Sequence, residues 1–417
     1  MSEWKKVKLG DICEIKSGKR LPKGSDFSSI PTEYKYIRAR DIKNGIINDD
    51  ELVYISEEVK QKISKYIVNT NDIVITIVGA SIGDVAYVTS QFDGVNLTEN
   101  AVRLTNFINH INSHYIFYIL NSPDYYMLMQ RIAGGAAQPK MGIYKVEAIE
   151  VTIPSLHIQD QVVAILSRYD SLIENYQKQI KLLEEAAQRL YKEWFVDLHF
   201  PGHENTKIVD GVPEGWEKKT LGELISYVRG KSYSSNEISD EGCIMVNLKN
   251  IQAFGGYKRD AEKRFIGEYK PEQTLQKGDL VMGVTDMTQE RRLVGHVALI
   301  PDFNEPATFS MDLIKIIPYS VPIIYLYCAM RYGGISKQIS PLANGVNVLH
   351  LKPDAMMGTM MVIPRKDLIE RFCPFVEEMT NKILKNQSQI RLLTEARDRL
   401  LPKLMSGEID INAPKGQ

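Results

Sequence analysis

The sequence has few cysteines and no long apolar run. Its four cysteines are scattered over 417 residues without a Cys-x-x-Cys pair, which excludes a zinc ribbon or a disulfide scaffold and favours a reducing cytoplasm. No apolar stretch is long enough to span a membrane, and the N-terminus has no apolar signal core, so we expect a cytoplasmic protein without a membrane partner. The net charge is −1, so any binding of nucleic acid must rely on basic residues gathered locally.

Catalytic motifs are also missing. The Gly-Lys-Ser at 230–232 resembles the end of a phosphate-binding loop, but Ile225 stands where that motif needs glycine. There is no Gly-x-Gly-x-x-Gly fingerprint and no Asn/Asp-Pro-Pro-aromatic tetrapeptide of the kind that amino-methyltransferases use. His110 and His114 are four residues apart without a carboxylate partner, so we interpret them as surface residues rather than metal ligands. We expect no catalytic, cofactor-binding or metal site.

What the sequence does contain is a long helical stretch that occurs twice. Residues 155–199 hold no Gly or Pro, and apolar side chains recur every three or four positions, which predicts one helix of about 65 Å with an apolar seam. In a second stretch, 365–401, the segment QIRLLTEARDRL (389–400) repeats QIKLLEEAAQRL (179–190) without a gap. Two copies of one seam predict a coiled coil with an intramolecular core. The expected core residues are Ile165, Leu172, Leu183, Leu190, Phe375, Ile383, Ile390, Leu393 and Leu400.

One residue breaks the match between the two helices. Pro374 stands where the first helix has Ala164. An interior proline removes a hydrogen bond and clashes with the preceding turn. We therefore expect either a kink at Pro374 or a helix that begins nearer Cys373 after a short turn.

The remainder of the chain repeats as well. WKKVKLGDICEIKSGK (4–19) corresponds to WEKKTLGELISYVRGK (216–231), and each half continues with strand segments, Gly-bounded turns and a last strand ending in Ile-Pro. This pattern predicts an α+β protein of two homologous mixed α/β domains, each followed by a long helix, and not a short-period solenoid. The expected segments are a domain at 1–154, a helix at 155–199, a linker at 200–215, a domain at 216–364, a helix at 365–405 and a polar tail at 406–417.

Basic and amide side chains gather on the predicted loops of both halves. Lysine and arginine on loops suit contact with phosphates, and Arg, Asn and Gln suit base edges in the major groove of DNA. Each residue alone is more readily explained as a solvated surface charge, but the duplicated sets together favour DNA binding. The candidates for DNA contact are Lys16, Lys19, Arg20, Lys23, Arg38, Arg40, Lys43, Gln138, Lys140, Lys231, Tyr233, Asn247, Lys249, Arg291, Arg292, Asn347 and His350.

Taken in order, these motifs resemble the DNA specificity (S) subunits of type I restriction-modification systems. The Trp…Leu-Gly-Asp/Glu…Gly-Lys opening of each half, EWFVDLHFPGHE (193–204) with VPEGW (212–216), and LMSGEID (404–410) carry the likeness over nearly the whole chain. The resemblance implies two target recognition domains, each reading half of a split asymmetric DNA site, joined by two antiparallel helices that form a coiled-coil spacer. It also implies a non-catalytic chain in phage defence that docks two methylation subunits, which would bind S-adenosylmethionine, with restriction subunits as further partners.

Corresponding loop positions of the halves carry different residues. Different donors and acceptors at equivalent positions predict two different half-sites, and hence a target without two-fold symmetry. By geometry, we expect Arg38 or Arg40 to contact guanine and Gln138 or Asn347 to contact adenine. The corresponding pairs are Arg38 with Asn247, Arg40 with Lys249, Gln138 with Val348, and Lys140 with His350.

Two other functions stay open at the level of sequence. One is a coiled-coil scaffold that binds protein and not DNA, whose behaviour with any duplex would be insensitive to salt. The other is a nuclease or methyltransferase with dispersed catalytic residues, which would act as a purified chain alone.

Overall fold

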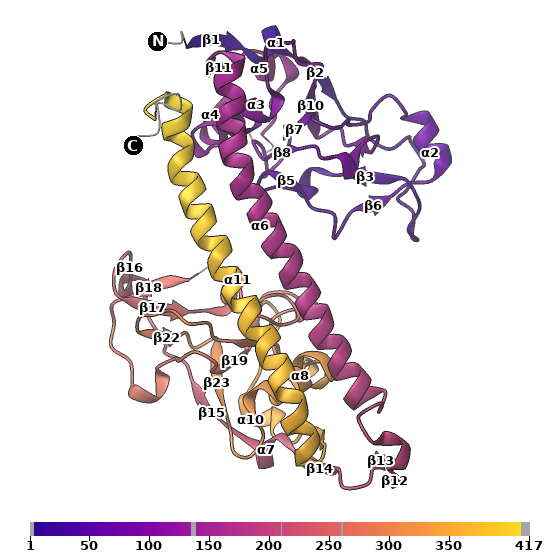
Figure 1. Ribbon diagram of the computed structural model, residues 1–417, viewed down its shortest axis with the longest axis vertical. Coiled ribbons are helices and arrows are strands. Elements are labelled where there is room, and N and C mark those ends of the chain that lie inside the picture. Colours follow the sequence, from indigo (N-terminus) through magenta and orange to yellow (C-terminus); the bar gives the residue numbers. More distant parts are fainter. Residues whose placement is uncertain (1–3, 135–138, 210, 260–261, 410–417) are drawn as a thin grey trace, which may run out of the picture. The chain divides into compact units, whose positions relative to one another are not determined.

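The computed structural model describes residues 4–134, 139–209, 211–259 and 262–409 (Figure 1). Contacts divide the chain into two compact units. Unit 1 takes the chain up to Asp170 together with the segment from Ala396 on, and unit 2 takes Ser171–Glu395. Each unit therefore holds one mixed α/β domain and a stretch of both long helices.

The domain of unit 1 has two main sheets, besides the two-stranded sheets β1-β11 and β4-β5. An antiparallel sheet has the strand order β2-β10-β7-β8, and a smaller sheet has the order β6-β3-β9, in which β3 and β9 are parallel. The strands are β1 (Lys5–Lys8), β2 (Glu14–Ser17), β3 (Lys35–Ile37), β4 (Ile42–Lys43), β5 (Ile46–Ile47), β6 (Val53–Tyr54), β7 (Ile73–Thr76), β8 (Val85–Tyr87), β9 (Asn96–Leu97), β10 (Ala101–Thr105) and β11 (Glu150–Ile153). The helices are α1 (Leu9–Ile12), α2 (Glu57–Lys62), α3 (Ser113–Leu120), α4 (Pro123–Ala133) and α5 (Ile143–Glu147).

Unit 2 repeats this plan. An antiparallel four-stranded sheet has the order β15-β23-β19-β21, and a second four-stranded sheet has the order β16-β18-β17-β22 with β17 and β22 parallel. The strands are β12 (Ile208–Val209), β13 (Val212–Pro213), β14 (Glu217–Thr220), β15 (Ile225–Arg229), β16 (Ile238–Ser239), β17 (Cys243–Val246), β18 (Lys263–Phe265), β19 (Leu280–Gly283), β20 (Thr285–Asp286), β21 (Val297–Leu299), β22 (Ala307–Phe309), β23 (Leu313–Pro318), β24 (Leu349–His350) and β25 (Met360–Ile363). The helices are α7 (Leu221–Leu224), α8 (Ile323–Tyr332), α9 (Ile335–Ile339) and α10 (Pro353–Met356).

One inner strand of the antiparallel four-stranded sheet in each unit, β7 or β19, is buried on both faces. In β7, Ile73 and Ile75 pack into a core that includes α3, whereas Val74 packs into a second core with the smaller sheet. In unit 2, β19 divides its side chains between two cores in the same way. A strand covered on both faces has a continuous apolar run, which explains why these segments show no polar alternation.

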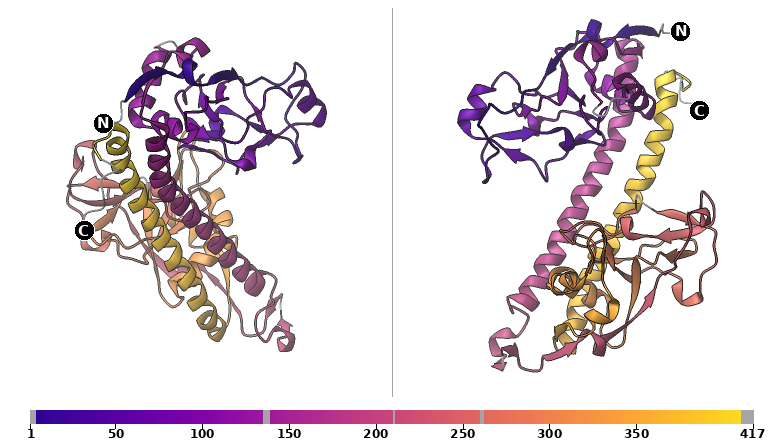
Figure 2. Two further views of the ribbon diagram at one scale, coloured as in Figure 1. Left: turned by 45° about the horizontal axis from the view of Figure 1, so that its top comes forward. Right: turned by 180° about the vertical axis from the view of Figure 1, so that it is seen from behind.

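Both long helices form, and they are antiparallel. Helix α6 spans Leu156–Tyr191 and continues into a π turn at Lys192–Val196, and α11 spans Lys366–Ser406. In unit 2, Asn386 donates to Gln179 at 3.2 Å, and the rings of Tyr191 and Phe372 lie 6.0 Å apart. The two helices therefore run in opposite directions (Figure 2). The expected α+β architecture of two mixed domains with long antiparallel helices is confirmed.

The buried seam differs from the expected core at two positions. Leu172 is 45% exposed and Phe375 is 56% exposed. Val162, Leu166 and Ala187 are buried instead, because a helix with 3.6 residues per turn drifts away from a strict three-four repeat. Of the other expected core residues, one is buried and the rest are half-buried: Ile383 is the buried one, and Ile165, Leu183, Leu190, Ile390, Leu393 and Leu400 are half-buried.

Pro374 does not delay the second helix. Helix α11 begins at Lys366 and continues without interruption past this residue, so the expectation of a start near Cys373 is wrong. Leu368, Phe372 and Val376 are fully buried around the proline. Their burial offsets the hydrogen bond that proline removes from the helix interior.

Two absences hold for the part of the chain that the structure describes. No helix there has both the length and the apolar character that crossing a membrane requires, and no three His, Cys, Asp or Glu side chains gather where they could hold a metal ion. His114 is not the surface residue expected from sequence, because its ring lies stacked between Tyr87 and Tyr118 at 4.2 and 4.8 Å.

Candidate nucleic-acid interface

The repeated Gly-Lys pair has a structural cause. A Cβ atom at Gly18 would lie 2.1 Å from the carbonyl oxygen of Thr98, and one at Gly230 would lie 2.0 Å from that of Ser310. The lysine after each glycine donates its backbone N–H to a neighbouring strand at 2.8 Å. Only glycine allows this close approach of two backbones, so the glycine marks the start of the predicted basic loop and not a phosphate cradle.

The basic loop of unit 1 presents its cations to solvent. The Nζ atom of Lys19 lies 5.5 Å from the ring centre of Tyr66, and Arg20 pairs with Glu99 at 2.5 Å with its side chain 80% exposed. Such surface ion pairs are weak, so both side chains remain available to a phosphate. Three further candidates of unit 1 are also exposed: Lys16, Lys23 and Lys43.

The two arginines near β3 have different roles. Arg38 donates its Nε and Nη2 atoms to the buried carboxylate of Asp41 at 2.9 and 2.8 Å, and its side chain is 18% exposed. The guanidinium donors of Arg38 are therefore already used by a carboxylate within the domain. Arg40 is 66% exposed and has carboxylate oxygens only at 3.9 Å, from Asp41 and Glu51. Of this pair, Arg40 is therefore the residue whose guanidinium is exposed to solvent.

Unit 2 has the same arrangement at the equivalent turn. Asn247 is 5% exposed, and its side-chain oxygen accepts the N–H of Lys249 at 3.0 Å, so that it caps a short helical turn. Arg38 likewise precedes such a turn. Lys249, like Arg40, is exposed on the turn itself. The structure thus places Arg38 and Asn247 as supports and Arg40 and Lys249 as the exposed pair.

A second pair of segments adjoins in each unit. In unit 1, Val78 forms a β-bridge with Lys140, which is exposed; Gln138 lies outside the described residues. In unit 2, Thr285 pairs with His350 on β20 and β24. The two segments therefore lie side by side within each unit.

Asp286 organises the loop that follows β20. Its carboxylate accepts the backbone N–H groups of Thr288 at 2.8 Å, Leu293 at 2.6 Å and Val294 at 3.2 Å, and the hydroxyl of Thr288 at 2.8 Å. Burial alone would raise the pKa of Asp286, but these hydrogen bonds lower it overall. A buried carboxylate with four donors fixes the loop backbone.

The remaining candidates of unit 2 lie on or near this loop. Arg292 is exposed and pairs with Glu290, whereas Arg291 is half-buried with a positive φ of 53°. Elsewhere in the unit, Lys231 is half-buried, and the ring of Tyr233 lies beneath the Nζ atom of Lys263 at 5.7 Å. Asn347 and His350 are both exposed.

Sequence reasoning missed the apolar members of this surface. Met287 is 78% exposed, Val346 is 87% exposed and Phe254 is 58% exposed. The backbone N–H of Phe254 donates to the carbonyl oxygen of Arg292 at 2.8 Å. An apolar residue in a loop gives no sequence signal of its own exposure, because burial depends on what packs over the loop.

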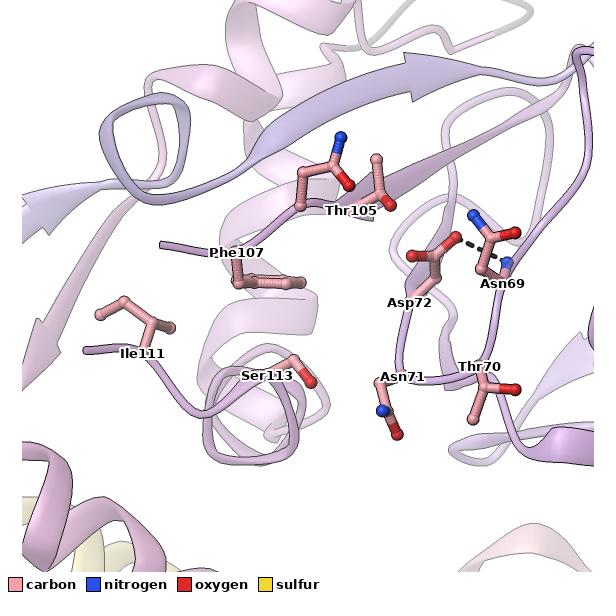
Figure 3. A pocket seen from close by; sticks show the side chains of 9 residues that line it. Asn69, Thr70, Asn71, Asp72, Thr105, Phe107, Ile111 and Ser113 are labelled. Atoms are coloured by element: carbon pink, nitrogen blue, oxygen red, sulfur yellow. Dashed lines mark hydrogen bonds between the residues drawn. The ribbon is translucent and has the colours of Figure 1, made fainter. Parts of the chain in front are cut away.

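A polar cavity of about 260 Å³ lies in unit 1, lined by loop residues and the start of α3 (Figure 3). Asp72 accepts the backbone N–H of Asn69 there at 2.8 Å, and burial raises its pKa. Asp72 is the one ionisable residue of the lining, which contains no cation. The lining of this cavity therefore supplies no positive charge to a phosphate.

The chain is similar in sequence to known proteins. Residues 1–185 match the model of the type I restriction modification DNA specificity domain. The MjaIX specificity subunit of Methanocaldococcus jannaschii is 27% identical over 308 residues, which cover 72% of this chain and 69% of that protein. The MjaVIII specificity subunit of the same organism is 23% identical over 98% of this chain and 93% of that protein.

These comparisons indicate a type I restriction-modification specificity subunit. Its fold is also that of the S subunit from M. genitalium, with a TM-score of 0.60 and 17% identity over 97% of this chain and 96% of that one. A specificity subunit is the non-catalytic, DNA-specifying component of such a system. The similarity to such subunits favours this role over the scaffold and the enzyme with dispersed residues.

Proposed function

We propose that each domain of this specificity subunit reads one half of a split, asymmetric site in double-stranded DNA. Unit 1 would present the loop of Lys19 and Arg20, together with Arg40 and Lys140. Unit 2 would present Lys249 with the loops around β20 and β24. Two modules joined in one chain bind as a bivalent ligand, so each half-site need supply only part of the affinity.

The observation that carries this proposal is one scaffold with different exposed side chains. The same capped turn presents Arg40 in unit 1 and Lys249 in unit 2, and the same bridged segments present Lys140 and His350. The guanidinium of arginine can bind guanine through two parallel hydrogen bonds, whereas lysine is a point charge. The two units thus share the backbone elements that present these side chains but differ in the hydrogen-bond donors presented. Such an arrangement suits the reading of two different DNA sequences.

We further propose that the long helices set the spacing between half-sites and dock two methylation subunits, with restriction subunits as additional partners. An open groove of about 610 Å³ on the helices of unit 2 supports the docking part. Leu183, Phe375 and Met379 give it apolar surface, and Lys382 and Lys385 add charge. S-adenosylmethionine would be bound by the methylation subunits, which transfer the methyl group to adenine.

Adenine methylation mapping tests the proposal. The chain and a methylation subunit encoded beside it would be co-expressed in a host that lacks other adenine methylation, and the modified DNA would be sequenced. A split, asymmetric motif that needs both chains is the expected result. Methylation by the partner alone at the same motif would refute the specificity role, and so would the absence of any defined motif from an assembled, active complex.

A further inference from the structure

Two apolar side chains on the β20–β24 surface stand out by their exposure. Val346 at 87% and Met287 at 78% are the most exposed large apolar side chains in the described part of the chain. A single exposed apolar residue needs no explanation. The two extremes, however, fall on adjoining loops of one unit, beside the candidates Arg292, Asn347 and His350.

Hydrogen bonds tie these two loops together. The side-chain Nε2 of Gln289 donates to the carbonyl oxygen of Val346 at 3.0 Å, and β20 pairs with β24 through Thr285–His350 and Asp286–Leu349. Met287 follows directly on β20, so both apolar side chains belong to one continuous surface.

The backbone that carries them is fixed. Asp286 accepts four hydrogen bonds from the loop of Met287. On the other loop, a Cβ atom at Gly345 would lie 1.9 Å from the carbonyl oxygen of Val348, and Asn344 exchanges two backbone hydrogen bonds with His350 at 3.0 and 2.9 Å. The exposure of Val346 therefore comes from a tight turn that holds it outward.

In unit 1, the residue that corresponds to Val346 is Ala136, which lies outside the described residues. In the described residues 78–84 and 139–141, Val78 is half-buried, Ile82 and Met141 are buried, and the exposed side chains are those of Ala80 and Lys140. Within these described residues no apolar side chain larger than alanine is exposed, so the exposed side chains there differ from those of unit 2.

We propose that Met287 and Val346 contact the C5-methyl group of thymine in the half-site read by unit 2, an inference that rests on the proposed function. In the major groove the thymine methyl group is the one apolar feature of the base edges, and apolar side chains recognise it. The neighbouring Asn347 and Arg292 supply polar partners for base edges or phosphates, so the surface matches a duplex better than a wholly apolar partner.

Deoxyuridine substitution tests this directly, because deoxyuridine pairs as thymine does but lacks the methyl group. The assembled complex of this chain with its methylation subunits would bind duplexes in which each thymine of the mapped motif is replaced in turn. We expect at least one replacement in one half-site to weaken binding about threefold to fivefold, as the loss of one buried methyl group does. That loss should vanish in Val346→Ala or Met287→Ala.

Matched variants control for the change of side chain. Val362 and Met360 lie on β25 of the same unit and are 36% and 49% exposed. Val362→Ala and Met360→Ala should keep the full sensitivity to deoxyuridine, and all four variants should melt within about a degree of one another because each residue is exposed.

The outcomes separate this inference from the proposed function. A defined motif whose thymines all tolerate deoxyuridine, a motif whose half-sites contain no thymine, or a sensitivity that Val346→Ala and Met287→Ala both leave unchanged would overturn the methyl contact while the specificity role stands. If these two variants no longer associated with the methylation subunits, Met287 and Val346 would be assigned to a protein contact instead. If the wild-type complex recognised no motif, the proposed function itself would fail.

Discussion

Replacement of Arg331 should destabilise unit 2 more than any surface arginine does. Arg331 extends from α8, and its guanidinium donates to Glu184 of α6 at 2.9 Å and to the hydroxyl of Tyr327 at 2.6 Å. The guanidinium also lies 5.7 and 5.2 Å from the ring centres of Tyr327 and Tyr332. The Arg331 side chain is 11% exposed and that of Glu184 is 23% exposed, so the pair is largely shielded from water.

The expected cost follows from what Arg331→Ala leaves behind. Breaking a buried ion pair costs about 3–5 kcal/mol because one charge stays unpaired, and the partial exposure of Glu184 reduces this. The lost contacts with two aromatic rings add about 0.5–1 kcal/mol each. We expect Arg331→Ala to lower the free energy of unfolding of unit 2 by about 3–4 kcal/mol. Arg331→Lys should cost about half as much, because lysine keeps the charge but loses the planar fork.

Tryptophan fluorescence in urea measures the free energy of unfolding of unit 2, provided that unit 1 contains no tryptophan. Trp194 and Trp216 both belong to a core cluster of unit 2, whereas Trp4 lies in unit 1. In a Trp4→Phe background, the fluorescence transition therefore reports on unit 2. Arg371 is exposed on α11, and Arg371→Ala serves as the control with an expected change below about 0.5 kcal/mol. A cost below about 1 kcal/mol for Arg331→Ala would refute the reasoning.

Four further outcomes are expected. Arg40→Ala should weaken methylation through one half-site only, read from methylation rates on duplexes altered in either half; an equal fall at unrelated sites would make it a phosphate contact. Arg38→Ala should instead lower the free energy of unfolding of unit 1 by about 2 kcal/mol, because the buried carboxylate of Asp41 loses its charged partner. An unchanged urea midpoint in the chain that retains Trp4, whose fluorescence reports on unit 1, would contradict this. Gly230→Ala should lower the free energy of unfolding of unit 2 by about 1–3 kcal/mol in the Trp4→Phe fluorescence assay, because its Cβ atom would clash with backbone. Burial lowers the pKa of His114 in the folded state, so the unfolded chain binds the proton more readily and stability should fall as pH drops below about 6.5; His114→Phe should flatten that dependence.

The candidate interface was predicted in part. The basic loops and the exchanged residues of the two halves are visible in the sequence, because they follow from comparing one half with the other. The same comparison did not separate Arg38 from Arg40, since both are arginines at exchanged positions. The difference arises only when Asp41 is buried beneath the turn and takes up the fork of Arg38.

The sequence by itself determined the duplication, the two long helices and the order of domains, because repeats and a 3.6-residue apolar period are properties of neighbouring residues. The tertiary structure alone decided which seam positions are buried, where Leu172 and Phe375 stay exposed, and which loop residues face outward. Burial depends on segments far apart in the chain. Asp286 fixes its loop through Leu293 and Val294. Val346 is exposed because no described residue of its own unit packs over the turn that carries it.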